Sequence, residues 1–242
     1  MRIYFTDFFE VTSETLEQYG AFNISLVNDL PLFVDPFLLF NSKKRKYREL
    51  HDKIIQYVAF LRDSSKESKI NVGLLKSWFC FPEIRQNWLG YSKTGNHGSG
   101  LGFKFAKALN ENLHTVFNNF GNEEISNGSH LEKLCLIKEG VGRDNISDFT
   151  TNLIKGFLLE YTETFTRAHI NPKYSAKHII DHVEFNYKTR TWEQREFLLP
   201  TLGKNYVLLT PKEILTKDDA WINKSDMVDI PQRQITYTIN ME

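Results

Sequence analysis

The residues best suited to chemistry are two aspartates, Asp144 and Asp148, in the segment GVGRDNISDFTTNLI. Gly140 and Gly142 precede them and a helical pattern of apolar residues follows, so we expect a turn that leads into a long helix. Carboxylates at such a place can bind a divalent cation such as Mg²⁺, or they can stabilise the start of the helix. Two interpretations therefore stay open: a metal site at both aspartates, or Asp148 as the helix cap with Asp144 in a side-chain turn.

A metal-dependent phosphodiesterase needs further charged groups beside its metal ligands. The segment HVEFNYKTRTWEQREF alternates apolar and polar residues around the polar turn KTRT, which predicts a hairpin. On its first strand Glu184, Asn186 and Lys188 should point to one side, and Glu193 and Arg195 should do so on the second. Glu184 and Lys188 are therefore the candidates to complete a catalytic group with the two aspartates.

Two other segments could contact phosphate. Basic residues crowd the start of a predicted helix, where positive charge opposes the helix dipole, and they form either a phosphate-binding patch or a solvated face. These residues are Lys43, Lys44, Arg45, Lys46 and Arg48. The glycine-rich loop over residues 90–102, which includes Gly98 and Gly100, precedes another helix. Its backbone amides could bind phosphate, or it could be a tight structural turn, because it lacks the Lys-Ser/Thr pair of a P-loop.

The segment HIIDH, residues 178–182, is a further candidate metal site. Two histidines four residues apart share one face of a helix, the spacing of a zinc-binding pair. No third ligand is evident nearby, so ordinary surface or core histidines are the alternative.

The elements that must position these residues follow from periodicity and capping. Asp35, before Pro36, is expected to cap a short helix, and Ser42 to cap a longer one. Helices are predicted over roughly residues 13–20, 42–62, 70–78, 101–113 and 147–170. Strands are predicted near the N-terminus, in the hairpin, over residues 204–210 and over residues 234–240. This pattern predicts one α+β domain over residues 1–242, helix-rich, with a small, mainly antiparallel sheet from the C-terminal third.

Bulk composition narrows the function classes. Thirty basic residues balance 30 acidic ones, so no global field draws the protein to nucleic acid or to an anionic membrane. The chain has only two cysteines, Cys80 and Cys135, both in apolar contexts typical of buried thiols. No run approaches the ~18 apolar residues of a membrane-spanning helix. We therefore expect a cytoplasmic protein without membrane contact.

The segments GVGRDNISDFTTNLI, DLPLFVDPFLL and LGYSKTGNHGSGLG together resemble an uncharacterised group of bacterial proteins associated with restriction and antiphage defence. The resemblance extends over roughly residues 28–220. The chain is also similar, more weakly, to the restriction-endonuclease-like nucleases, in which an aspartate and the glutamate of a Glu-x-Lys motif bind the metal ion and the lysine stabilises developing charge. That similarity would assign the metal aspartate to Asp144 or Asp148. The Glu-x-Lys would fall on Glu184 with Lys188, which are four residues apart in place of two, or on Glu193 with Arg195, which lacks the lysine.

Two functions follow as expectations. The first is a defence-associated protein that acts on nucleic acid, as a Mg²⁺-dependent nuclease. The second is a non-catalytic subunit of a multi-protein complex, in which the aromatic surplus and the strand over residues 234–240 serve an interface.

Overall fold

The computed structural model describes residues 3–66, 70–90, 101–116 and 143–217, and it has the predicted α+β class. The α-helices are α1 (Phe5–Phe8), α2 (Ser13–Tyr19), α3 (Pro36–Phe40), α4 (Arg45–Ser65), α5 (Val72–Phe79), α6 (Phe103–Val116), α7 (Arg143–Leu153) and α8 (Lys155–His169). The strands are β1 (Leu32–Val34), β2 (Ser175–Ile180), β3 (Phe185–Asn186), β4 (Thr191–Trp192), β5 (Arg195–Leu202), β6 (Asn205–Tyr206) and β7 (Leu215–Lys217). Short 3₁₀ helices are η1 (Arg85–Asn87), η3 (Pro172–Tyr174) and η4 (Lys212–Ile214).

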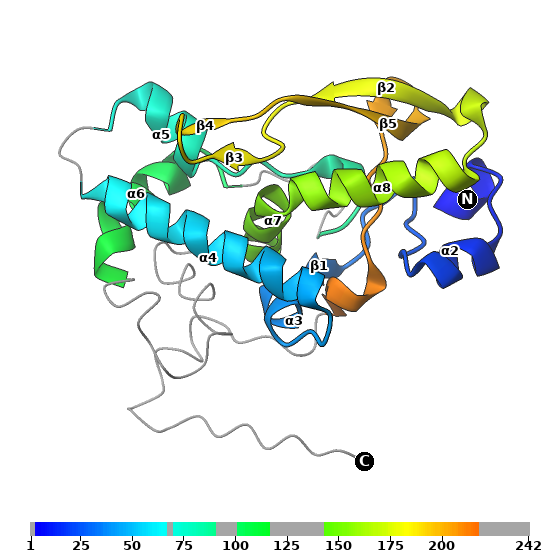
Figure 1. Cartoon of the computed structure of the whole chain (residues 1–242), viewed down its shortest axis with the longest axis horizontal. Helices are drawn as coiled ribbons and strands as arrows, with labels where there is room; N and C mark the ends of the chain where they lie inside the picture. Colours follow the sequence, from blue (N-terminus) through cyan, green and yellow to red (C-terminus); the bar gives the residue numbers. More distant parts are fainter. Residues whose placement is uncertain (1–2, 67–69, 91–100, 117–142, 218–242) are drawn as a thin grey trace, which may run out of the picture.

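The helices form a layer beneath the longest strands. In Figure 1, α8 runs under β2 and β5, with α1 and α2 at one end of the molecule and α5 and α6 at the other. Helix α8 packs against β5, α4 packs against α3, α6 and α7, and α7 packs against β1. Helix α7 therefore lies where the helical layer meets the strand pair β1–β7. In the described ranges, no helix is long and apolar enough to cross a membrane.

Among the described residues all paired strands are antiparallel, as predicted for the C-terminal third. Strand β5 lies between β2 and β6, and β3 pairs with β4 as the predicted hairpin, with Phe185 opposite Trp192. Strand β1 was not expected from the sequence, because Pro31 and Pro36 flank an apolar run of only a few residues. It pairs with β7, with Leu32 opposite Lys217, so the sheet structure is not confined to the C-terminal third.

A continuous apolar core includes buried residues from α1 through to η4. Tyr57 of α4 is almost fully buried in it, with its ring 5.2 Å from that of Trp192 and 5.0 Å from that of Phe185. Its hydroxyl donates to the carbonyl of Trp78 at 2.9 Å, which satisfies the buried polar group. The hairpin is thereby fixed against α4 and α5.

The long helix predicted over residues 147–170 is two helices. Helix α7 begins at Arg143 and ends at Leu153. The backbone at Ile154 then departs from helical geometry, with φ −102° and ψ 12°. The hydroxyls of Thr150 and Thr151 donate to carbonyls one turn earlier, at 2.7 Å each. Such side-chain bonds compete with the backbone ladder and bend helices, which apolar periodicity does not reveal.

Three capping predictions have different outcomes. Asp35 caps α3 as expected, because its Oδ1 accepts from the amide of Phe37 at 2.8 Å. Asp148 does not cap a helix, because α7 begins before it and places it in the helix interior. Ser42 does not cap α4, whose N-cap is Lys44; the Ser42 hydroxyl accepts from the Lys44 amide in the turn before it.

The prediction of a helical HIIDH segment is wrong. His178 lies in β2, where its Nε2 is 2.9 Å from the hydroxyl of Thr201. His182 lies in a bend after the strand, with a φ of 56°, and its ring is 5.5 Å from that of Trp192. The two histidines therefore do not share a helix face, and the zinc-pair interpretation loses its geometry.

Candidate functional site

Helix α7 presents Asp144 and Asp148 one turn apart on the same face. This face meets two further carboxylates, Asp29 in the segment before β1 and Glu83 between α5 and η1. All four side chains are half-buried. We call these four residues the carboxylate cluster. The predicted metal aspartates therefore lie together, but in a helix and not in a turn.

The ionised form of the carboxylate cluster is energetically unfavourable. Burial, with repulsion from Asp144, Glu83 and Asp29, raises the pKa of Asp148 to about 8. Burial also raises the pKa of Asp29 to about 7, with repulsion from Glu83 and Asp144 added and attraction to Arg85 opposing it. Both carboxylate oxygens of Asp29 and Oδ2 of Asp148 are buried without a hydrogen-bond partner in the described part of the chain. A bound cation would relieve this repulsion.

Two contacts fix α7 in this position. The hydroxyl of Ser147 accepts from the amide of Val34 at 2.9 Å, which holds the middle of α7 against β1. The side-chain amide of Asn152 donates to the carbonyl of Pro82 at 2.8 Å. This second bond ties the end of α7 to the segment that carries Glu83. These two hydrogen bonds thus tie α7 to β1 and to the segment that carries Glu83.

Gly90 lets the chain approach Asp144 closely. Its φ is 126°, and a Cβ added there would lie 2.8 Å from Oδ1 of Asp144. Its amide donates to the carbonyl of Leu30 at 3.0 Å, and the amide of Leu30 donates to the carbonyl of Trp88 at 3.1 Å. These bonds bring the segment after η1 beside Asp29. Only glycine meets both the backbone and the space requirements here.

The donor set of the carboxylate cluster suits a hard divalent cation, because Mg²⁺ prefers carboxylate oxygens. Its buried oxygens without partners are consistent with that chemistry. Among the described residues, however, no three His, Cys, Asp or Glu side chains are arranged to hold a metal ion as they stand. Binding a cation here therefore requires the carboxylates to turn toward one another.

Glu184 and Lys188 lie in different surroundings from the two aspartates. The Glu184 carboxylate accepts from Lys53 at 2.7 Å and also pairs with Arg195, and the hydrogen bond from Lys53 is the largest cause of its lowered pKa. Lys188 lies in the hairpin turn, where its amide donates to Oδ1 of Asn186 at 3.0 Å. The expectation that they share one strand face is wrong, because β3 is only two residues long and includes neither.

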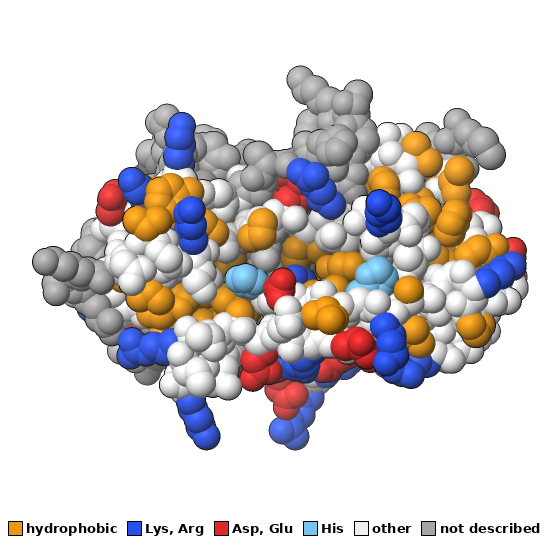
Figure 2. Space-filling view, turned by 90° about the horizontal axis from the view of Figure 1, so that it is seen from above, with side chains coloured by type: hydrophobic (Ala, Val, Ile, Leu, Met, Phe, Trp, Pro, Cys, Tyr) orange, Lys and Arg blue, Asp and Glu red, His pale blue; other side chains and the backbone are white. Residues whose placement is uncertain are grey.

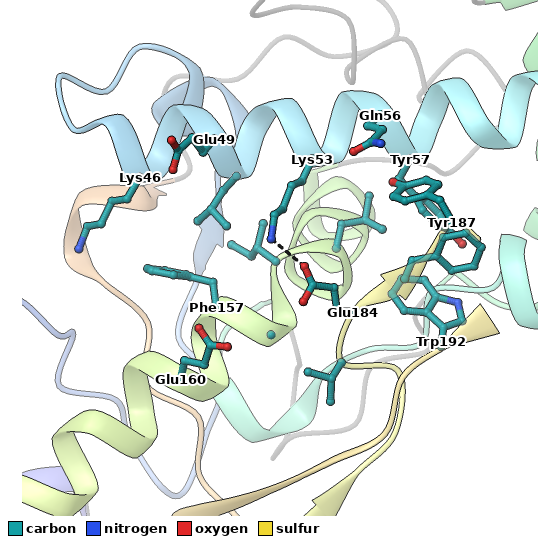
Figure 3. Close-up of a pocket in the computed structure, with 16 residues that line it drawn as sticks. Lys46, Glu49, Lys53, Gln56, Tyr57, Phe157, Glu160, Glu184, Tyr187 and Trp192 are labelled. Carbon is teal, nitrogen blue, oxygen red and sulfur yellow. Dashed lines mark hydrogen bonds and ion pairs between the residues drawn. The ribbon is translucent and has the colours of Figure 1, made fainter. Parts of the chain in front are cut away.

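A second feature, the hairpin pocket, opens between α4 and the β3–β4 hairpin. It has a volume of about 440 Å³, and the α7–α8 break forms part of its wall. Figure 3 shows the Lys53–Glu184 ion pair crossing it between Phe157 and the aromatic group of the hairpin. Its lining residues are Lys46, Glu49, Leu50, Lys53, Gln56, Tyr57, Leu153, Ile154, Gly156, Phe157, Glu160, Val183, Glu184, Phe185, Tyr187 and Trp192.

The basic residues at the start of α4 are partly neutralised. Lys44 forms an ion pair with Glu213. Arg45 pairs with Glu49, with its Nε 2.6 Å from the glutamate oxygen. Lys46 instead lies over aromatic rings. Arg48 donates to a backbone carbonyl, and Lys43 is exposed. A single continuous phosphate patch is therefore not formed by all five.

Other predicted contacts lie outside the described residues. These are Gly98 and Gly100 of the glycine-rich loop, together with the strand over residues 234–240. Their predicted roles stay predictions.

The sequence did not indicate Asp29, Glu83 or Lys53 as site residues. Asp29 and Glu83 are far from the α7 aspartates along the chain, and no spacing rule connects them. A local signal does exist for Asp29, a carboxylate directly before the buried run LPLFV. Lys53 lies within an amphipathic helix that carries other basic residues. The sequence does not distinguish it from them, because its partner Glu184 is distant along the chain.

The fold and the site define an α+β protein with a half-buried carboxylate cluster on its α7 helix. The chain belongs to the family described as a domain of unknown function, DUF8370, which matches residues 10–223. That span contains the carboxylate cluster and the hairpin pocket. No curated protein and no solved structure matches the chain.

Proposed function

We propose that the protein is a divalent-cation-dependent nuclease, and that the carboxylate cluster binds its metal ion. The observation that carries this proposal is the set of buried carboxylate oxygens without partners on Asp29 and Asp148. Burial and repulsion raise the pKa values of Asp29 and Asp148, which is costly for folding, and such perturbed groups are typical of functional sites. The role in bacterial antiphage defence rests on the resemblance of three sequence segments.

In this proposal each residue has a defined task. Asp144 and Asp148 ligate the cation from one face of α7, and Asp29 and Glu83 complete the oxygen set. Arg85 is exposed beside Glu83, with Nε 3.3 Å from its carboxylate, where it can meet a substrate phosphate. A bound Mg²⁺ would supply Lewis acidity to the phosphodiester and a lowered pKa to its own water.

The test is cleavage of plasmid and single-stranded DNA by purified protein with Mg²⁺, Mn²⁺ or EDTA. The variants are Asp144→Asn and Asp148→Asn, with Asp52→Asn on the exposed face of α4 as the matched control. We expect metal-dependent cleavage that falls roughly 100-fold or more in both cluster variants, because a lost ligand weakens metal binding. The control should cleave like the wild type. Metal-independent cleavage, or full activity in Asp148→Asn, would refute the proposal.

A non-catalytic subunit is the second candidate, and the edge of the three-stranded sheet favours it. Strand β2 pairs with β5 on one side, and within the described chain no strand pairs with its other side. Ile179 on β2 is 67% exposed, and Figure 2 shows apolar side chains lying among charged ones on this face. Edge strands bind partner chains through their backbone. Ile179→Lys should then abolish a partner complex without lowering the melting temperature.

A further inference from the structure

The hairpin pocket has the size of a ligand site. Its volume of about 440 Å³ lies within the ~300–1,000 Å³ typical of small-molecule pockets. Lys46, Lys53 and Gln56 face it from α4, so polar groups are spread over ~15 Å of helix at ~1.5 Å per residue. None of the four residues of the carboxylate cluster lines this pocket.

Ion pairs engage most of the charged side chains that line the pocket. Glu49 pairs with Arg45, Glu184 pairs with Lys53 and Arg195, and Glu160 shares Arg195 with Glu184. Within the described part of the chain, Lys46 is the lining charge that has no carboxylate partner. Its Nζ lies 4.9 Å from the ring centre of Tyr47 and 5.8 Å from that of Phe157. An anionic group of a ligand could pair with Lys46 at this end of the pocket.

The opposite end of the pocket is aromatic. The ring of Phe185 lies 5.2 Å from those of Tyr187 and Trp192, and the Tyr187 side chain is 37% exposed. Figure 3 places Gln56 beside Tyr57 at this end and Lys46 beside Phe157 at the other. The exposed Gln56 amide, a donor and acceptor at once, has no hydrogen-bond partner within the described residues. Flat aromatic surface with a free amide suits the face and edge of a nucleobase.

We infer that the hairpin pocket binds one unpaired nucleotide of a single-stranded nucleic acid. The base lies at the aromatic end against Tyr187, the Gln56 amide meets the base edge, and the phosphate points toward Lys46. This inference deepens the proposed nuclease function and rests on it, because it assigns the substrate class as single-stranded. A free nucleotide shares the same chemistry, so the test includes it as a separate ligand.

The experiment measures binding of a fluorescent, short single-stranded DNA to the protein by anisotropy in EDTA, so that no metal-dependent cleavage occurs. The variants are Lys46→Glu and Tyr187→Ala. The matched control is Lys204→Glu, an equal charge change in the exposed turn between β5 and β6. We expect both pocket variants to weaken binding roughly tenfold or more, because stacking and phosphate contacts are lost. Lys204→Glu should change it less than about twofold.

Three further readouts sharpen the result. Lys46→Glu should reduce the salt dependence of binding by about one in the log–log slope, whereas Gln56→Leu should change the preference among bases. A duplex of the same sequence should bind more weakly than the single strand. AMP should compete only weakly, since tighter binding of AMP than of the oligonucleotide would overturn the single-strand assignment.

Equal affinities for wild type, Lys46→Glu and Lys204→Glu would refute the inference, even if Tyr187→Ala failed to fold. Failure of the nuclease proposal is distinguishable, because it shows in the cleavage assay and not in EDTA. Oligonucleotide binding that depends on Lys46, without any metal-dependent cleavage, would refute the nuclease and leave the pocket as a nucleotide site. Metal-dependent cleavage, together with pocket variants that bind the oligonucleotide like the wild type, would support the nuclease and refute the nucleotide site in the pocket.

Discussion

Replacing Asp148 by asparagine should stabilise the metal-free protein at alkaline pH. The pKa of Asp148 is about 8 in the folded protein, against a reference value of 3.8. The folded state therefore holds the proton more tightly than the unfolded state does. Unfolding is linked to proton release between these two values, so the stability of the wild type falls as the pH rises from about 4 to about 8. Asparagine resembles the protonated acid and does not ionise, so the variant should keep its stability as the pH rises.

The magnitude follows from the same pKa difference. At about 1.4 kcal/mol per pH unit, the difference between 3.8 and about 8 sets an upper limit of about 6 kcal/mol. The side chain is partly exposed, and structural relaxation and water entry reduce the effect to about 2 kcal/mol. For a chain of this length, this corresponds to a rise of about 4–8 °C in the melting temperature.

The assay is urea unfolding of wild type and Asp148→Asn in EDTA at pH 5 and at pH 8.5, repeated with excess Mg²⁺. The two proteins should differ little at pH 5, and the variant should be more stable at pH 8.5. Mg²⁺ should stabilise the wild type and not the variant, because binding to the folded state alone adds to its stability. A variant that is less stable than the wild type at pH 8.5 in EDTA would show that the carboxylate stabilises the fold, and the charge argument would fail.

Two further substitutions test the local structure. Asp35→Ala should lower the free energy of unfolding by about 1 kcal/mol, because the amide of Phe37 loses its cap; urea unfolding measures this, and an unchanged midpoint would contradict it. Gly90→Ala should destabilise by about 1–3 kcal/mol, since its positive φ and the contact with Asp144 both disfavour a Cβ, whereas Gly102→Ala, with open space around it, should be tolerated by the same measurement. Similar losses of unfolding free energy in the two glycine variants would contradict the argument that Gly90 is needed for its close approach to Asp144.

Local signals in the sequence predicted several of the elements. Thr12 accepts from a backbone amide at the start of α2, and Gly20 ends that helix with a φ of 83°. Asp35 caps α3, and the hairpin forms where alternation placed it. These outcomes depend on neighbouring residues alone, and the α+β class follows from their sum. Capping and period-two alternation are short-range effects, so a single sequence is sufficient to reveal them.

The candidate site was less predictable because it is assembled from distant segments. The pairing of Asp144 and Asp148 is local, and the sequence indicated it. Asp29 and Glu83 join them only through contacts of α7 with the segments around β1 and η1, which no spacing encodes. The position of Lys188 was predicted wrongly, because the strand was expected to continue past Asn186, where the turn begins. Strand length is set by tertiary pairing, and a period-two pattern does not reveal it.

The pairing of β1 with β7 has a consequence for how the chain is made. Leu32 lies opposite Lys217, and the amide of Asp35 donates to the carbonyl of Ile214 at 2.9 Å. During synthesis, β1 leaves the ribosome long before β7, its strand neighbour in the described chain, exists. Strand β1 and the α3 helix that follows therefore cannot complete their packing until almost the whole described chain has been made. A ribosome stalled ahead of β7 would present an unpaired apolar edge, so this protein should depend on chaperones late in its synthesis.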